Sequence, residues 1–267
     1  MSDLADRAAR LLGSEVAETR HFAGGSLSSI VFMRLSDGRE MLVKSGPSPE
    51  TEARMLGAIR DAGVSAPKVY AADDSVLAIE RLPDDGGLSA AWGDLGSELR
   101  RLHETTGEFY GWEDDYAFAR LPIRNAFSDD WPAFFAEHRL LAAARGTGAA
   151  VERRVAALAA RLGDILPQRP KPSLVHGDLW SGNVLTFSGR VSGLIDPACY
   201  FGDGEVDVAM LGLFARPSGE FYEAYGPLPG HRERRPVYAL WPALVHLALF
   251  GSGYRSMVEG YLAEAGF

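Results

Sequence analysis

The sequence predicts an α+β fold in two lobes, a small N-terminal β-sheet lobe over residues 1–82 and a larger, mainly helical lobe over residues 83–267. Short strand-like runs separated by turn residues fill the first eighty residues or so. Apolar residues at helical spacing dominate the rest of the chain. The glycine-rich residues 84–88 lie between the two patterns and are typical of a linker. Because 46% of the 267 residues are hydrophobic, the chain can bury a sizeable core.

The N-terminal lobe begins with three predicted strands. They cover residues 20–23, 29–35 and 40–44, and Asp37-Gly38 is a strong hairpin signal between the last two. Gly24, Gly25 and Ser26 join the first two strands. Adjacent glycines let backbone N–H groups approach phosphate oxygens, but they are also common in plain turns, and for this loop both interpretations stay open.

A helix is predicted after the third strand. Ser48 suits the N-cap, Pro49 suits the first helical position, and acidic residues follow in the first turn. Glu52 lies on the apolar face of this helix, so we expect it to pair with Lys44, which ends the preceding strand. A lysine at that position reaches nucleotide phosphates in kinases. The alternative role of Glu52 is to stabilise the helix dipole.

The next predicted strand leads out of the N-terminal lobe. Residues 76–79 are apolar and read as a buried strand, and residues 80–83 leave it as an extended connector. We expect the backbone of Glu80 and Leu82 to offer hydrogen bonds to the edge of an adenine ring at this hinge between the lobes.

Beyond the linker, most of the chain is predicted to be helical. Apolar stripes indicate helices around residues 95–102, 131–145, 151–166, 205–214, 220–225 and 236–265. Residues 111–130 form the longest irregular stretch. Long loops of this kind often carry function, although an ordinary surface connection is an equal alternative.

The most informative motif lies between residues 174 and 197. Asn183 follows Asp178 by five residues, and Asp196 ends an apolar segment thirteen residues later. Two short strands joined by a turn separate Asn183 from Asp196, so a hairpin brings these side chains to the same end. Phosphoryl transfer from a magnesium nucleotide needs a carboxylate to accept the proton of the attacking hydroxyl and oxygen ligands for the metal. These three residues can supply those groups, whereas the alternative is a set of ordinary turn residues.

Protein kinases carry His, Asp and Asn at similar offsets. This chain has Gly177 where protein kinases have Arg, and Asp196-Pro197 where they have Asp-Phe-Gly. These two departures indicate a small-molecule kinase rather than a protein kinase.

Composition excludes several other classes of function. The net charge of −9 argues against a generic nucleic-acid or membrane-surface binder, whose binding face is basic. Cys199 is the only cysteine, so neither an intrachain disulfide nor a thiolate metal cluster can form. No signal peptide or long apolar run is visible, and we expect a cytoplasmic protein.

The chain resembles the fructosamine kinase (ketosamine-3-kinase) family, within the larger fold group of aminoglycoside and choline kinases, which have a two-lobed, protein-kinase-like fold. The resemblance is carried by residues 176–183 (HGDLWSGN) and 194–210 (LIDPACYFGDGEVDVAM), with support from residues 24–26, 131–140 and 247–254. Trp180 and the YFGDGEVD stretch are specific to the fructosamine kinase family, whereas the His-Gly-Asp and Asn elements indicate only the larger fold group. Gly204 stands where relatives are expected to have Arg, and residues 111–130 are atypical; both departures concern the substrate.

The resemblance implies ATP-dependent phosphorylation of the 3-hydroxyl of ketosamines, the adducts of reducing sugars with amines, either free or protein-bound. It also implies that the product falls apart and frees the amine. The resemblance further implies that Asp178 is the catalytic base and that Asn183 and Asp196 bind Mg²⁺. The remaining implied roles are a phosphate-orienting pair (Lys44 and Glu52), a phosphate-covering loop (Gly24, Gly25 and Ser26), a face for the sugar ring (Trp180), attraction of the substrate amine (Asp203 and Glu205), and bracing of the catalytic loop (Asp207).

Three functions remain open on the sequence alone. The first is a ketosamine kinase. The second is a kinase of another small hydroxyl compound, such as an aminoglycoside, choline or a sugar amine. The third is a pseudokinase that binds nucleotide without turnover, and the intact set of Lys44, Asp178, Asn183 and Asp196 argues against it. The oligomeric state is not predicted.

Overall fold

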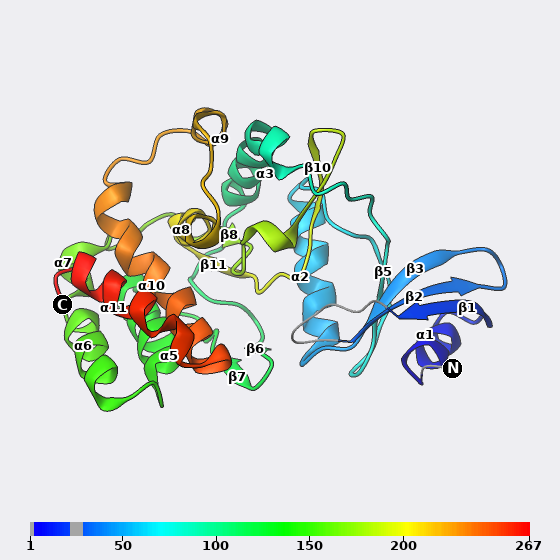
Figure 1. Ribbon diagram of the computed structural model, residues 1–267, viewed down its shortest axis with the longest axis horizontal. Coiled ribbons are helices and arrows are strands. Elements are labelled where there is room, and N and C mark those ends of the chain that lie inside the picture. Colours follow the sequence, from blue (N-terminus) through cyan, green and yellow to red (C-terminus); the bar gives the residue numbers. More distant parts are fainter. Residues whose placement is uncertain (1–2, 22–28) are drawn as a thin grey trace.

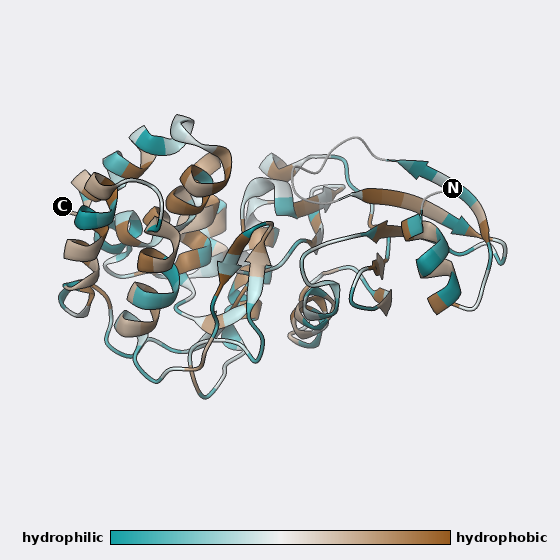
Figure 2. Cartoon of the chain, turned by 90° about the horizontal axis from the view of Figure 1, so that it is seen from below, coloured by the Kyte–Doolittle hydropathy of each residue, from teal (hydrophilic) through white to brown (hydrophobic). Residues whose placement is uncertain are grey.

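The computed structural model describes residues 3–21 and 29–267 and has two lobes, a small β-sheet lobe and a larger helical one (Figure 1). Gly24, Gly25 and Ser26, the expected phosphate-covering loop, lie outside the described residues. Figure 2 shows hydrophobic residues along the strands and the inner faces of the helices, and hydrophilic residues on the outward side of the N-terminal helix.

The small lobe is built on a five-stranded antiparallel sheet in the order β1-β2-β3-β5-β4. Its strands are β1 (Val16–His21), β2 (Ile30–Leu35), β3 (Glu40–Lys44), β4 (Val69–Ala72) and β5 (Leu77–Ile79). Helix α1 (Asp3–Leu11), which the sequence analysis does not predict, packs its alanines against the sheet. The register places Lys44 opposite Leu77 on one side and Ile30 on the other.

Helix α2 (Pro49–Asp61) follows β3 as expected and buries Glu52 together with Met55, Leu56 and Ile59. Ser48 occupies the N-cap position, and its carbonyl accepts a hydrogen bond from the Glu52 amide at 3.0 Å. Its side chain makes no capping hydrogen bond, contrary to expectation. The start of this helix therefore depends on Pro49 and on packing rather than on a serine cap.

The large lobe surrounds one continuous hydrophobic core that also reaches α2. Its helices are η1 (Leu88–Ala90), α3 (Trp92–Glu104), α4 (Trp131–Phe135), the π-helical η2 (Ala136–Leu141), α5 (Ala142–Ala144), α6 (Ala149–Ala159), α7 (Leu162–Ile165), η3 (Ser181–Asn183), α8 (Glu205–Phe214), α9 (Gly219–Tyr225), α10 (His231–Phe250), η4 (Ser252–Tyr254) and α11 (Arg255–Glu264). Three two-stranded sheets pair β6 (Tyr116–Phe118) with β7 (Leu121–Ile123), β8 (Ser173–Val175) with β11 (Tyr200–Gly202), and β9 (Val184–Phe187) with β10 (Arg190–Leu194).

Two departures from the expected helices and loops affect the surroundings of the candidate site. The single helix expected over residues 236–265 is two helices, because Gly251 takes a φ of 88° and ends α10. Residues 111–130, expected to be irregular, contain the β6–β7 hairpin, and Figure 1 shows this hairpin between the small lobe and α10. We call residues 111–130 the strap.

Candidate active site

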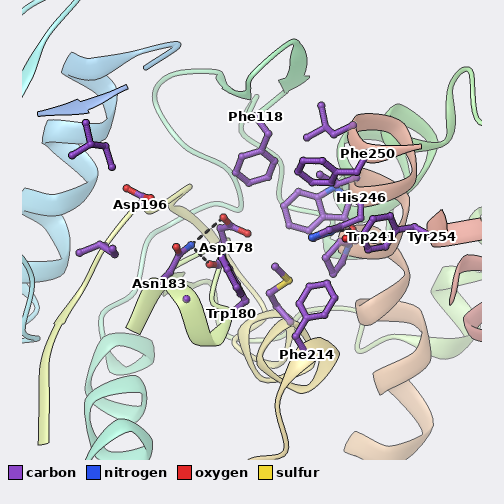
Figure 3. Close-up of a pocket in the computed structure, with 18 residues that line it drawn as sticks. Phe118, Asp178, Trp180, Asn183, Asp196, Phe214, Trp241, His246, Phe250 and Tyr254 are labelled. Atoms are coloured by element: carbon purple, nitrogen blue, oxygen red, sulfur yellow. Dashed lines mark hydrogen bonds between the residues drawn. The ribbon is translucent and has the colours of Figure 1, made fainter. Parts of the chain in front are cut away.

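A cavity of about 850 Å³ lies where the two lobes meet. Three of its lining residues, Asp178, Asn183 and Asp196, make one end polar. Figure 3 shows aromatic side chains across from them, drawn from the strap, from α8 and from the α10–η4 region. These aromatic lining residues are Phe118, Phe214, Trp241, His246, Phe250 and Tyr254.

The loop that presents Asp178 follows β8 and is shaped by a glycine. Gly177 has a φ of +80°, and a Cβ at this position would lie 2.1 Å from the carbonyl oxygen of Ala198. Asp207 then holds the loop, because its carboxylate accepts hydrogen bonds from the amides of His176 (2.6 Å) and Gly177 (2.9 Å). The bracing role expected for Asp207 is thus confirmed. The position occupied by Arg in protein kinases can only be glycine in this backbone conformation.

His176 joins the loop of Asp178 to that of Asp196. Its Nε2 donates to the carbonyl of Ile195 at 3.0 Å, and its Nδ1 accepts from the amide of Asp178 at 3.3 Å. One ring nitrogen is a donor and the other an acceptor, so the imidazole is neutral. Burial lowers the pKa of His176, which favours the same state.

Asn183 lies at the end of η3, just before β9, and orients the Asp178 side chain. Its Nδ2 donates to the Asp178 carbonyl at 2.8 Å and to Asp178 Oδ2 at 3.1 Å. The amide is thereby fixed with its Oδ1 free to accept or to bind a cation. Burial raises the pKa of Asp178 to about 7, against the Asn183 hydrogen bond and with a smaller contribution from Asp196. A carboxyl with a pKa near neutrality suits general-base catalysis.

Lys44 connects the two lobes at the edge of this cavity. Its Nζ lies 2.7 Å from Glu52 Oε1, so the expected ion pair with α2 forms, and it also contacts Asp196. Lys44 and Glu52 are both buried. Burial lowers the pKa of Lys44, but the two carboxylates outweigh it, and the pKa is raised overall. Lys44 therefore stays charged.

Asn183 and Asp196 form a donor set that fits Mg²⁺. Both line the polar end of the cavity, and they offer an amide oxygen and a carboxylate. Asp196 has a φ of 52°, which is uncommon for a residue other than glycine and often marks a functional position. Mg²⁺ takes one or two such oxygens together with phosphate and water oxygens.

The connector after β5 is held by Lys68. The Glu80 amide donates to the Lys68 carbonyl at 2.8 Å, and Glu80 Oε2 accepts from the Lys68 amide at 3.1 Å. Within the described residues, the Glu80 carbonyl and the Leu82 amide have no hydrogen-bond partner. The adenine contact expected of Glu80 and Leu82 stays a prediction.

The substrate residues expected from the sequence divide into two groups. Trp180 is 38% exposed and lines the cavity beside Asp178. Asp203 and Glu205 are buried and are absent from the described lining. Asp203 accepts a hydrogen bond from the Tyr238 hydroxyl at 2.7 Å, and Glu205 forms a two-pronged ion pair with Arg234. The structure does not support the expectation that Asp203 and Glu205 attract the substrate amine, because both carboxylates are buried and already have partners inside the fold.

Sequence reasoning missed the aromatic end of the cavity. Its residues come from three distant segments, namely the strap (Phe118), the end of α8 (Phe214) and the α10–η4 region. In the sequence, the α10 residues belong to an apolar stripe that looks like core. The only available signal was the likeness of residues 247–254 to a family motif.

In the described part of the chain, no helix is long and apolar enough to cross a membrane.

Comparison with known proteins gives consistent results. The model of the fructosamine kinase family matches residues 5–265. A probable ketoamine kinase of Synechocystis is 38% identical over 207 residues, covering 72% of this chain and 68% of the relative. The crystal structure of a fructosamine-3-kinase candidate from Thermobifida fusca is 30% identical, with a TM-score of 0.90 and 98% of each chain covered.

A more distant structure confirms the fold class. The gentamicin complex of the aminoglycoside phosphotransferase APH(2″)-IIa is 13% identical, with a TM-score of 0.64, and the match covers 99% of this chain and 95% of that one. At this identity the likeness concerns the fold alone. The two-lobed, protein-kinase-like α+β fold expected from the sequence is thus confirmed.

Proposed function

The chain belongs to the fructosamine kinase family, and from that premise we propose that it transfers the γ-phosphoryl group of ATP to the 3-hydroxyl of a ketosamine, with Asp178 as the general base. As a member of this family the protein is an ATP-dependent kinase that phosphorylates a hydroxyl of ketosamines. The position of Asp178 supports its proposed role as general base. Asp178 lines the cavity beside Asn183 and Asp196, and Asp207 holds its loop through two backbone amides.

The proposed reaction is an in-line displacement at phosphorus. The 3-hydroxyl oxygen forms a bond to the γ-phosphorus while the bond from that phosphorus to the β,γ-bridging oxygen breaks, and ADP leaves. The hydroxyl proton passes to Asp178. Asn183 fixes the Asp178 carboxylate so that one oxygen faces the substrate hydroxyl, and Trp180 supplies a face for the sugar ring.

The nucleotide is proposed to bind between residues 1–82 and 83–267. Lys44, oriented by Glu52, would contact the phosphates, and the Glu80 carbonyl and Leu82 amide would contact adenine. Gly24, Gly25 and Ser26 would cover the phosphates. Asn183 and Asp196 would hold Mg²⁺, which neutralises charge that develops on the phosphates.

Two features of the cavity argue against the alternative functions, a pseudokinase and a kinase of aminoglycosides. A pseudokinase is not favoured, because Asp178, Asn183 and Asp196 line one cavity and Lys44 contacts Asp196. An aminoglycoside carries several ammonium groups, whereas Asp178 and Asp196 are the only acidic residues in the described lining. Fewer carboxylates favour a substrate with a single ammonium group.

The test is an ADP-release assay on fructosamines and ribulosamines of simple amines, with kanamycin and choline as competing candidates. Ketosamines should give the highest kcat/KM, and the product should carry phosphate on the 3-oxygen by NMR. Asp178→Asn should lower kcat by about a hundred- to ten-thousand-fold while nucleotide affinity is retained. Near-native turnover by Asp178→Asn, or better turnover of kanamycin than of any ketosamine, would contradict the proposal.

A further inference from the structure

The aromatic end of the cavity is formed by several rings that lie together. His246 lies at the centre of a group of rings, with centroid distances of 5.0 Å to Phe214, 5.4 Å to Phe250 and 5.0 Å to Tyr254. Trp241 lines the same end of the cavity (Figure 3). We call these five residues the aromatic wall. Phe214 and Phe250 are 43% and 45% exposed, so the wall has apolar surface still to bury.

The wall carries no charge. Burial lowers the pKa of His246, and its Nδ1 is committed to the Pro242 carbonyl at 2.7 Å. A carbonyl only accepts, so Nδ1 carries the proton and the neutral ring keeps Nε2 as an acceptor. The described lining contains no lysine or arginine, and its two carboxylates, Asp178 and Asp196, lie at the polar end. A cationic amine therefore meets no repelling positive charge among the described lining residues, and aromatic faces attract cations.

The chemistry of a ketosamine sets where its amine must lie. The amine nitrogen is on C1, three bonds from C3, and bonds of about 1.5 Å keep these two atoms within about 4 Å of each other. When the 3-hydroxyl is at Asp178, the nitrogen therefore lies within the cavity. The substituent on the nitrogen then extends into the part of the cavity that lies away from Asp178. The aromatic wall faces the polar end across that space.

We propose that the aromatic wall is the subsite for the amine substituent of the ketosamine, and that it selects adducts of aryl or bulky apolar amines over adducts of small polar amines. This inference rests on the proposed function, because Asp178 fixes the position of the sugar. An apolar substituent gains free energy by covering Phe214 and Phe250. A hydroxyl in the same place loses water, can replace it only at the few polar atoms of the wall such as His246 Nε2, and covers less apolar surface.

Two substrates that differ at one group test the proposal. The fructose adducts of phenethylamine and of ethanolamine share the sugar, the ammonium and a two-carbon linker, and differ in phenyl against hydroxyl. We expect kcat/KM for the phenethylamine adduct to be higher by about ten- to a hundredfold, as burial of one phenyl group implies. Phe250→Ala should reduce this ratio by about three- to tenfold by lowering the phenethylamine value alone. Phe250→Tyr should preserve it.

Phe127→Ala is the matched control, since Phe127 is a 58% exposed phenylalanine outside the described lining of the cavity. It should leave both values unchanged. Equal kcat/KM for the two adducts in the wild type would overturn the subsite but leave the kinase function intact. An equal loss on both adducts in Phe250→Ala would also overturn it, because the ring would then support the sugar or the fold. If neither adduct is phosphorylated, both the subsite and the proposed function fail.

Discussion

Glu52, Glu205 and Asp207 are three buried carboxylates, and each is satisfied by a different kind of partner. Glu52 pairs with Lys44 next to the cavity, Glu205 pairs with Arg234 away from it, and Asp207 accepts backbone N–H groups of the catalytic loop. A buried carboxylate without such partners is costly, so the partner determines what the residue does. Asp207 shapes the site, whereas Glu205 holds α8 to the start of α10.

Glu205→Gln tests this division of roles. The substitution removes the charge opposite Arg234, and we expect the free energy of unfolding to fall by about 1–3 kcal/mol. The KM for a ketosamine should not change, because Glu205 is absent from the described cavity lining. Urea unfolding and steady-state kinetics on the same preparation measure both effects. A raised KM with unchanged stability would restore Glu205 as a substrate residue.

Gly177→Ala tests the backbone conformation of the catalytic loop. A methyl group here would lie 2.1 Å from the Ala198 carbonyl oxygen, and the φ of +80° is strained for alanine. We expect a loss of about 2–4 kcal/mol in the free energy of unfolding, together with loss of activity. Gly212→Ala in α8 is the control, since its Cβ would meet nothing within 4 Å, and it should be neutral or slightly stabilising. Equal effects of the two substitutions on stability would show that the close approach to Ala198 is not needed.

The strap contacts both lobes. Tyr116 lies 3.4 Å from Glu52 on α2, Arg54 of α2 contacts Glu113 and Asp114, and Arg120 donates to the Ala248 carbonyl of α10. Arg139, in the π-helical turn η2, forms hydrogen bonds to the strap. This buried arginine donates to the Arg124 carbonyl and to Asn125 Oδ1, both at 2.7 Å. It also lies 4.0 Å from the centroid of the Tyr200 ring.

Arg139→Met should therefore loosen the strap. It leaves Asn125 Oδ1 and the Arg124 carbonyl without their donor, and we expect a loss of about 2–4 kcal/mol in the free energy of unfolding. Arg145→Met, at an exposed position close by, should stay within about 0.5 kcal/mol of the wild type. Hydrogen exchange should become faster in residues 111–130 of Arg139→Met. Unchanged exchange there would mean that the strap does not depend on Arg139.

Local patterns predicted some elements better than others. The strand ending at Lys44, the helix carrying Glu52 and the hairpin between Asn183 and Asp196 follow from short-range periodicity and turn residues. Helix α1 was missed because nine residues form a stable helix only when packed on the sheet, which the sequence does not display. Glu205 was misassigned because its partner Arg234 lies 29 positions away. The aromatic wall was missed because its members meet only after folding.

At the scale of the whole molecule, the candidate site is shared between the lobes. Lys44 and Glu52 come from the small lobe, and Asp178, Asn183 and Asp196 come from the large one. The contact between Lys44 and Asp196 joins the lobes. A nucleotide that touches both sets of residues binds only the assembled molecule, so its binding energy adds to the stability of the native state.

ATP with Mg²⁺ should therefore raise the melting temperature. At about a hundred times the dissociation constant, binding adds about 2.7 kcal/mol. For a chain of this size this corresponds to about 5–10 °C. Removing the metal with a chelator should reduce this rise in melting temperature. In Lys44→Met, the rise on adding nucleotide, measured from the melting temperature of that variant alone, should be smaller than in the wild type. No shift at high nucleotide concentration, or an undiminished shift in Lys44→Met, would contradict the shared site.

The exposure of Trp180 has an optical consequence. The chain has five tryptophans, and the other four are 8% exposed or less, against 38% for Trp180. An indole in contact with water emits at longer wavelength than a buried one, so the red edge of the protein's fluorescence arises from the cavity beside Asp178. A molecule that enters the cavity and covers this ring shifts the emission to the blue and shields it from a soluble quencher. The protein thus carries its own unlabelled reporter of site occupancy.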